Sequence, residues 1–262
     1  MEIAPLVGRP ALLAEGKKRV LAVADLHLGI EYELFLCGAS IPSQTGKLLS
    51  SLLELVKASS PDLLVIVGDL KHNVPRTSWQ ERTEVPRFVE ALSELAEVRV
   101  VPGNHDGGLA DLLPEAKLAP ATGLVLDQVG YFHGHTRPSP EVLRCRRLVA
   151  GHVHPTVRLA DPLGHGHSQR VWARAPLLPE ETGEGAGAGA DAGRESAERE
   201  IIMMPAFNPL CGGLPLNADI QEERGPLPRM ARLRLARIYL LDGTFLGSLE
   251  HIRASKPGRA GR

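Results

Sequence analysis

The chain is poor in cysteine and in aromatic residues, and it has no long apolar run. Its three cysteines, Cys37, Cys145 and Cys211, lie far apart and form no Cys-x-x-Cys pair, which argues against a disulfide framework and a zinc ribbon. No run reaches the roughly 18 apolar residues of a transmembrane helix, and no basic segment followed by an apolar one opens the sequence. We therefore expect reduced thiols, no membrane association and a cytoplasmic location.

The charge balance shows that the chain as a whole is not a polycation. Thirty basic and 31 acidic residues leave a formal charge of −1, so net charge does not draw the protein to nucleic acid. Only 4% of the residues are aromatic, but 43% are hydrophobic, which at 262 residues is enough for one core of Leu, Val, Ala and Ile. We predict a single α/β domain over residues 1–253 and leave the oligomeric state open.

The first hundred residues alternate between strand and helix patterns. Apolar runs of strand length occupy residues 19–24, 63–67 and 98–101, and apolar residues at helical spacing mark 42–58 and 85–96. This β-α-β-α-β order predicts a parallel sheet with helical crossovers. Ligands of such sheets bind outside the carboxyl ends of the strands.

The rest of the chain has shorter strand patterns separated by turns, and these predict a second sheet packed on the first. They lie at 124–126, 129–132, 148–150, 157–159, 171–173, 201–204, 234–241 and 245–249. Residues 179–200 are rich in Gly, Ala and acidic residues without an apolar face, and they predict a disordered insertion. Residues 254–262 predict a flexible basic tail.

Five short histidine-containing strings are the most informative feature of the sequence. They read Asp25-Leu-His27, Gly68-Asp69-Leu-Lys-His72, Gly103-Asn104-His105-Asp106, His133-Gly134-His135 and Gly151-His152-Val-His154. Each follows a predicted strand, so side chains from distant parts of the chain can meet at one sheet edge. Their imidazole, carboxylate and amide donors suit zinc, manganese or iron.

Hydrolysis of a phosphate ester is one reaction that needs such donors. Two divalent ions roughly 3.5–4 Å apart supply a nucleophile at neutral pH and neutralise the attacking and leaving oxygens. Ions this close need a bridging carboxylate, for which Asp69 is the natural choice. Asp25 and His27 stand two residues apart at a strand end and point the same way, so one ion can take both.

The strings resemble, in the same order, the motifs D-x-H, G-D, G-N-H-[DE], H and G-H-x-H of the calcineurin-like metallophosphoesterase superfamily. The resemblance covers roughly residues 19–160. It implies a four-layer α/β/β/α fold, in which two mixed β-sheets pack as a sandwich flanked by helices. It also implies two ligand sets, the first being Asp25, His27, Asp69 and His154, and the second Asp69, Asn104, His133 and His152.

The same resemblance implies catalytic roles for residues that bind no ion. His105 would contact the scissile phosphate or protonate the leaving oxygen, and Asp106 would orient it. His133 and His135 compete for the fourth motif, with His133 preferred because the superfamily usually places its ligand just before a glycine. His72 is a candidate second catalytic group, since double-strand-break-repair nucleases of the superfamily have a histidine three residues after the bridging aspartate.

A narrower resemblance is carried by Pro205-Ala-Phe-Asn-Pro-Leu210 and Gly212-Gly213, together with the first and last histidine strings. Through these segments the chain is similar to a branch of archaeal ICC-like phosphoesterases and bacterial DNA-ligase-associated phosphoesterases. This implies a phosphodiesterase of nucleotides or nucleic-acid ends that uses two divalent ions, with Mn²⁺ expected first and Zn²⁺, Fe or Ni²⁺ as other suitable ions. The expected mechanism is attack by a hydroxide that bridges the two ions.

Three other functions stay open on the sequence: a monoesterase of nucleotides or small phosphate esters, a nuclease acting on DNA or RNA, and a non-catalytic nucleic-acid-binding scaffold that retains its metals. Basic residues bear on the last two. Arg137, Arg144, Arg146 and Arg147 lie between two of the histidine strings, and residues 224–262 contain nine basic residues against two acidic ones. These residues either form a rim that attracts phosphate or belong to a solvated face.

Overall fold

The apolar strands of the first hundred residues form the centre of one sheet in a computed structural model of the chain. The structure describes residues 2–160, 166–178, 199–218 and 225–252. Most of the predicted insertion, residues 179–198, and all of the predicted tail therefore lie outside the described residues. Glu200, the last residue of that predicted insertion, instead opens a strand, because its backbone pairs with Arg147.

The first sheet is five-stranded and mixed. Its order is β1-β2-β3-β4-β5, in which β3, β4 and β5 run parallel and β1 and β2 extend the sheet antiparallel. The strands span Glu2–Pro5, Ala11–Glu15, Arg19–Val23, Leu63–Val67 and Glu97–Val101. The predicted parallel core is confirmed, whereas β1 and β2 were not predicted.

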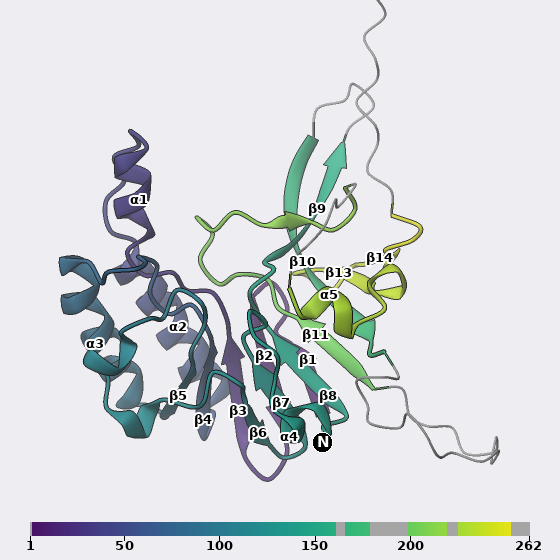
Figure 1. The fold of residues 1–262 in the computed structure, drawn as a ribbon, viewed down its shortest axis with the longest axis horizontal. Coiled ribbons are helices and arrows are strands. Elements are labelled where there is room, and N and C mark those ends of the chain that lie inside the picture. The colour runs from purple at the N-terminus through teal and green to yellow at the C-terminus, as the bar shows by residue number, and fades with distance from the viewer. Residues whose placement is uncertain (1, 161–165, 179–198, 219–224, 253–262) are drawn as a thin grey trace, which may run out of the picture.

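Helices cover one face of this sheet. The helices α2 (Thr45–Ser59) and α3 (Trp79–Ser93) pack on it, and the short helix α1 (Ile30–Leu36) projects beyond them (Figure 1). α3 begins before the predicted residue 85, because Ser78 and Glu81 form a capping box that satisfies the first backbone amides. None of the helices in the described ranges has the length and apolar character needed to cross a bilayer.

The second sheet is nine-stranded and mixed. Its main path is β12-β9-β10-β11-β8-β7-β6, with β13 paired to β10 and β14 to β13. The strands β6 to β14 span Leu124–Leu126, Val129–Phe132, Arg147–Ala150, Pro155–Ala160, Gly166–Pro176, Glu200–Met203, Leu214–Pro215, Arg237–Leu240 and Phe245–Ser248. The predicted strand 234–241 is shorter than expected, since a 3-10 turn occupies Leu233–Leu235.

Side-chain alternation explains the layers. In β4, Leu63, Val65 and Val67 contact the second sheet, whereas Leu64 and Ile66 contact the helices. The outer face of the second sheet packs on the short helices α4 (Pro140–Leu143) and α5 (Leu227–Met230). The fold is therefore the predicted sandwich of two mixed sheets flanked by helices, with a thin outer layer on the second sheet (Figure 1).

Candidate functional site

The histidine strings lie at the carboxyl ends of strands from both sheets. Asp25 and His27 follow β3, Asp69 follows β4, Asn104 to Asp106 follow β5, His133 follows β7, and His152 and His154 follow β8. β3, β4 and β5 are parallel, as are β7 and β8, so their ends meet at one rim of the sandwich. The fold thus brings the predicted residues together from about half of the sequence.

The first group of potential ligands consists of Asp25, His27, Asp69 and His154. One donor atom from each lies within 4.8 Å of the others. His27 Nε2 is 3.4 Å from Asp69 Oδ2, and His154 Nε2 is 3.2 Å from Asp25 Oδ1. The other ring nitrogen of His154, Nδ1, donates to the carbonyl of Gly212 at 2.9 Å, which leaves Nε2 available for a cation.

The second group consists of Asp69, His133 and His152, with the amide of Asn104 beside it. His133 Nε2 lies 3.2 Å from Asp69 Oδ2 and 3.1 Å from Asn104 Oδ1. His133 Nδ1 donates to the carbonyl of Val67 at 3.1 Å, so Nε2 is again the available nitrogen. Asp69 belongs to both groups, the position that a bridging carboxylate would need.

His135 lies at a greater distance from this second group. Its ring centre is 5.3 Å from that of His133 and 6.3 Å from that of His152, and it does not join the group of converging donor atoms. The geometry therefore favours His133 over His135 at the fourth motif.

The backbone around these side chains is locally strained. Five of the residues have left-handed φ angles, which cost non-glycine residues about 1–3 kcal/mol each. They are Asp25 (58°), His27 (43°), Asp69 (50°), His152 (72°) and His154 (42°). β3 ends at Val23, so tight turns rather than strand alternation direct Asp25 and His27, and the predicted reason for their common direction is wrong.

Two glycines of the motifs are needed because other groups approach their α-carbons closely. A Cβ on Gly68 would lie 2.1 Å from His133 Nδ1, and a Cβ on Gly103 would lie 2.2 Å from Asp69 Oδ1. Non-bonded contacts of a Cβ atom are essentially never shorter than 3.0 Å. The glycines therefore allow the potential ligands to come within reach of one another.

Burial and neighbouring charge set the protonation of the cluster. Burial lowers the pKa of His27 to about 3 and that of His152 to about 4, so both rings are neutral at pH 7. Burial opposes ionisation of Asp69 and His133, but their mutual hydrogen bond outweighs it. The pKa of Asp69 falls below its ordinary value, and the pKa of His133 rises to about 9. Neutral imidazoles and ionised carboxylates are the forms that bind cations, so His27, His152 and Asp69 are already in those forms, whereas His133 would release its proton when an ion binds.

The donor set fits divalent metal ions. Three buried atoms of the first ligand group have no hydrogen-bond partner among the described residues: Asp25 Oδ2, His27 Nε2 and His154 Nε2. Such orphaned polar atoms are rare in protein interiors, and a bound ion is one of the accepted explanations for them. Mixed nitrogen and oxygen donors suit first-row divalent ions.

His105 lies beside these groups, but Asp106 does not orient it. His105 Nδ1 is 2.5 Å from the carbonyl of His72, which fixes the tautomer with a proton on Nδ1. The carboxylate of Asp106 accepts instead from the backbone amides of Gly103 at 2.8 Å and Lys71 at 3.1 Å. The expected Asp106–His105 pair is therefore corrected: Asp106 is buried and holds the loop that carries His105, because these amides need an acceptor.

His72 lies between His27 and helix α1. Its Nδ1 is 3.0 Å from His27 Nδ1, and its Nε2 pairs with the carboxylate of Glu33 on α1. His27, His72 and His105 also bring one nitrogen each within 4.8 Å of the others. His72 is thus adjacent to the reactive region, and its carbonyl positions His105.

The sequence analysis missed two charged residues next to the site. Lys71 is fully buried, and its Nζ donates to the carbonyls of Asn73 and His105, both at 2.6 Å. Glu33 pairs with His72 from a helix that was not predicted. Lys71 lies inside the second histidine string, and a lysine between apolar and potential ligand residues was the sequence feature that could have indicated its role. No sequence feature indicated the role of Glu33, because that role depends on where α1 projects.

Comparisons with known proteins bear on the family and the fold of the chain. The model of the calcineurin-like phosphoesterase family matches residues 18–174. No curated protein sequence matches the chain. The solved structure of nuclease MPE from Pseudomonas putida is 18% identical, with a TM-score of 0.50 and coverage of 92% of this chain and 98% of that one.

Two further solved structures align over most of their length. Yfce, a phosphoesterase from E. coli, is 19% identical with a TM-score of 0.39, covering 87% of this chain and 96% of that one. A conserved protein of Streptococcus pneumoniae TIGR4, described as a predicted phosphoesterase, is 11% identical with a TM-score of 0.31, covering 88% and 94%. The family match spans more than half of the residues, so the chain belongs to the calcineurin-like phosphoesterase family, hydrolases that act on phosphate esters.

Proposed function

We propose that the protein is a two-metal phosphodiesterase that acts on nucleotides or nucleic-acid ends. The observation that carries the proposal is that two groups of buried donors share Asp69, beside a groove that His105 lines. The proposal includes the narrower branch resemblance, that of ICC-like and DNA-ligase-associated phosphoesterases.

The ligand assignment follows the two groups. Asp25, His27, Asp69 and His154 would hold one ion, and Asp69, Asn104, His133 and His152 the other. Mn²⁺ is the proposed ion, since the donors are nitrogen and oxygen, and Zn²⁺, Fe and Ni²⁺ suit the same donors. When bound, the ions would activate water and neutralise charge on the phosphoryl oxygens.

The chain's own residues would position and protonate the substrate. The backbone amide of His105 donates to Asp69 Oδ1 at 2.9 Å, which ties the catalytic loop to the bridging carboxylate. With Nδ1 held by the carbonyl of His72, Nε2 of His105 is the ring nitrogen left to interact with a phosphate or leaving oxygen. Lys71 and Asp106 are positioning residues. Lys71 Nζ donates to the carbonyl of His105, and the carboxylate of Asp106 accepts from the amides of Gly103 and Lys71.

The groove beside His105 supports a substrate with a nucleobase. Its volume is about 910 Å³, and Tyr32 and Trp79 line it together with His72 and His105. The side chain of Trp79 is 81% exposed although it opens α3, and Tyr32 is 48% exposed. Exposed aromatic rings bind unstacked bases by stacking, which is worth about 1–3 kcal/mol per base.

Turnover of chromogenic esters tests the proposal. With Mn²⁺, the protein should hydrolyse bis-p-nitrophenyl phosphate faster than p-nitrophenyl phosphate, and His105→Ala should lower both activities by about 10²–10⁴-fold. A faster reaction with the monoester would overturn the diesterase assignment. No turnover of either ester, with DNA binding intact, would favour the scaffold alternative. Cleavage within a circular single-stranded DNA would favour the nuclease alternative over end processing.

A further inference from the structure

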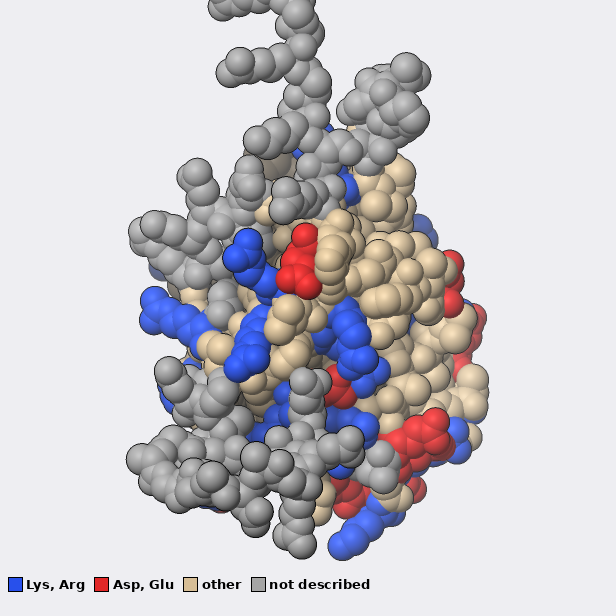
Figure 2. All heavy atoms as spheres, turned by 90° about the vertical axis from the view of Figure 1, so that its right-hand side faces the viewer, with Lys and Arg blue, Asp and Glu red and all other residues tan. Residues whose placement is uncertain are grey.

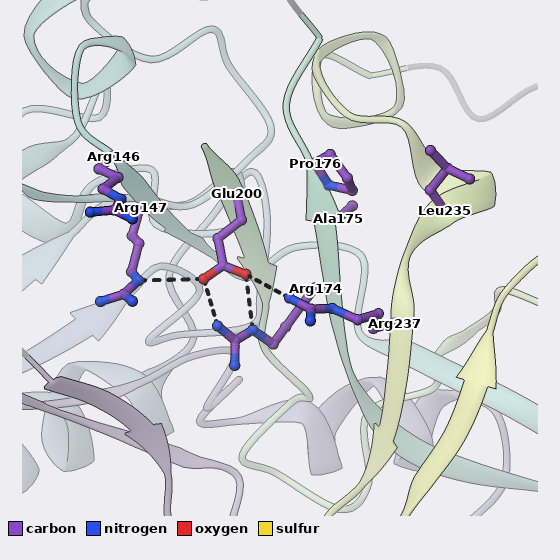
Figure 3. Close-up of a pocket in the computed structure, with 8 residues that line it drawn as sticks. All are labelled: Arg146, Arg147, Arg174, Ala175, Pro176, Glu200, Leu235 and Arg237. Carbon is purple, nitrogen blue, oxygen red and sulfur yellow. Dashed lines mark hydrogen bonds and ion pairs between the residues drawn. The ribbon is translucent and has the colours of Figure 1, made fainter. Parts of the chain in front are cut away.

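A second concentration of charge lies at the opposite end of the second sheet from the candidate metal site. We name it the arginine pocket: a cavity of about 460 Å³ lined by Arg146, Arg147, Arg174, Ala175, Pro176, Glu200, Leu235 and Arg237 (Figure 3). β8 starts at Arg147 and delivers His152 past its other end. At about 3.3 Å per residue, the five residues from Arg147 to His152 place the pocket at most roughly 16 Å from the site, because only Arg147–Ala150 is extended.

The carboxylate of Glu200 contacts three of the arginines of this pocket. Arg174 donates to both oxygens of Glu200, from Nε at 3.0 Å and from Nη2 at 2.5 Å. Arg147 Nε lies 3.4 Å and Arg237 Nη2 3.6 Å from the same carboxylate (Figure 3). The surrounding arginines lower the pKa of Glu200 despite its burial, so it stays ionised. Within the described part of the chain, four guanidinium groups and one carboxylate line the pocket, so these residues carry a net positive charge.

Strand register makes this arrangement costly for the fold. Glu200 pairs directly with Arg147, but Arg174 stands directly opposite Arg237 in the antiparallel pair of β10 and β13. Like charges in directly opposed positions destabilise a sheet. Arg146 is exposed, and its side chain has no ion pair or hydrogen bond within the described part of the chain. A structural ion pair would need only one of these four arginines.

The positive surface continues beyond the arginine pocket. Leu235 also lines an adjoining hollow formed with Arg232, Leu233, Arg234, Glu250 and His251. Basic side chains spread over the centre of this face (Figure 2). Two adjoining hollows with six arginines and two carboxylates fit a row of phosphates better than one small anion.

The geometry points to the arginine pocket as a secondary binding site for the phosphodiester backbone of a nucleic-acid strand. The choice of nucleic acid rests on the proposed function, whereas the affinity for phosphate follows from the pocket itself. A strand that reaches both sites must bridge a separation of up to roughly 16 Å. Longer strands therefore use the pocket, and dinucleotides do not.

Binding of a 20-nucleotide single-stranded DNA tests the inference. Fluorescence anisotropy is measured on the full chain in the His105→Ala background, so that the probe is not consumed. Adding Arg146→Gln and Arg237→Gln together should weaken binding about 25-fold at 0.1 M salt and reduce the slope of log K against log salt by roughly 1.4. Arg87→Gln removes one positive charge from an exposed position on α3 and should change neither the affinity nor the salt slope. Unchanged affinity in the double variant would overturn the inference.

Three further readouts separate the alternatives. Inorganic phosphate that binds the protein in an arginine-dependent way, with no arginine effect on DNA, would mean a single-anion site and overturn the inference. Arg237→Gln should leave Tm unchanged or raise it, because it relieves the repulsion with Arg174; a lower Tm with unchanged DNA affinity would identify a structural ion network instead. In the otherwise native chain, the double variant should hydrolyse bis-p-nitrophenyl phosphate normally.

The inference and the proposed function fail in different ways. If no phosphate ester is hydrolysed but DNA binding depends on Arg146 and Arg237, the proposed function is wrong and the pocket stands. If the esters are hydrolysed and replacing both arginines leaves the DNA affinity unchanged, the inference about the pocket is wrong and the proposed function stands.

Discussion

Replacing Gly103 with alanine tests whether close backbone approach holds the bridging carboxylate in place. The new Cβ would lie 2.2 Å from Asp69 Oδ1 and 2.6 Å from Asp69 N, and atoms do not come closer than 3.0 Å to a real Cβ. The carboxylate must therefore move by roughly 1 Å, well beyond the tolerance of about 0.2 Å in a metal–ligand distance. We expect loss of both ions and a fall in turnover of at least about 100-fold.

The same overpacking should cost about 1–3 kcal/mol of unfolding free energy and lower Tm by roughly 3–10 °C. Gly107→Ala is the matched control, because it lies in the same loop, has no left-handed φ and has no atom within 4 Å of its added Cβ. Manganese per chain is measured by mass spectrometry after dialysis, and turnover with bis-p-nitrophenyl phosphate. Full metal content and turnover in Gly103→Ala, or equal losses in Gly107→Ala, would refute the reasoning.

Three other outcomes follow from the site and the arginine pocket. His105→Ala should keep both ions and lower turnover by about 10²–10⁴-fold, and loss of metal in this variant would contradict its separation from the ligands. Trp79→Ala should raise KM for a dinucleotide by roughly 5- to 150-fold without changing bis-p-nitrophenyl phosphate turnover, whereas equal effects on both would contradict stacking. The depressed pKa of Glu200 means that its ion pairs stabilise the fold above pH 4.5 and that this contribution is lost as pH falls through the folded-state pKa. Chemical denaturation should therefore show the stability advantage of the native chain over Glu200→Gln shrinking below pH 4.5; a constant difference would contradict the ion-pair account.

Continuous apolar runs made the central strands predictable. Leu63–Val67 forms β4 with the predicted bounds. Its side chains are apolar on both faces, which is typical of a strand buried between two layers. The start of α3 could also have been predicted from the sequence, because Ser78 and Glu81 have the spacing of a capping box. β1, β2 and α1 were not predicted, because their short segments are stabilised by pairing and packing with distant residues.

The positions of the site residues were more predictable than their partners. Strand ends place Asp25, Asp69 and His152 at one rim, so the motifs alone predict that they meet. The hydrogen bond from His105 to the carbonyl of His72 could not be predicted, because it depends on the path of two loops. The arginine pocket was equally hidden, since Arg174 and Arg237 become neighbours only through the register of β10 and β13.

Diffraction at the manganese absorption edge, from crystals grown with Mn²⁺, tests the central claim most directly. We predict two anomalous peaks roughly 3.5–4 Å apart, with a carboxylate oxygen of Asp69 in contact with each. A single peak, or a pair in which Asp69 contacts only one ion, would contradict the account.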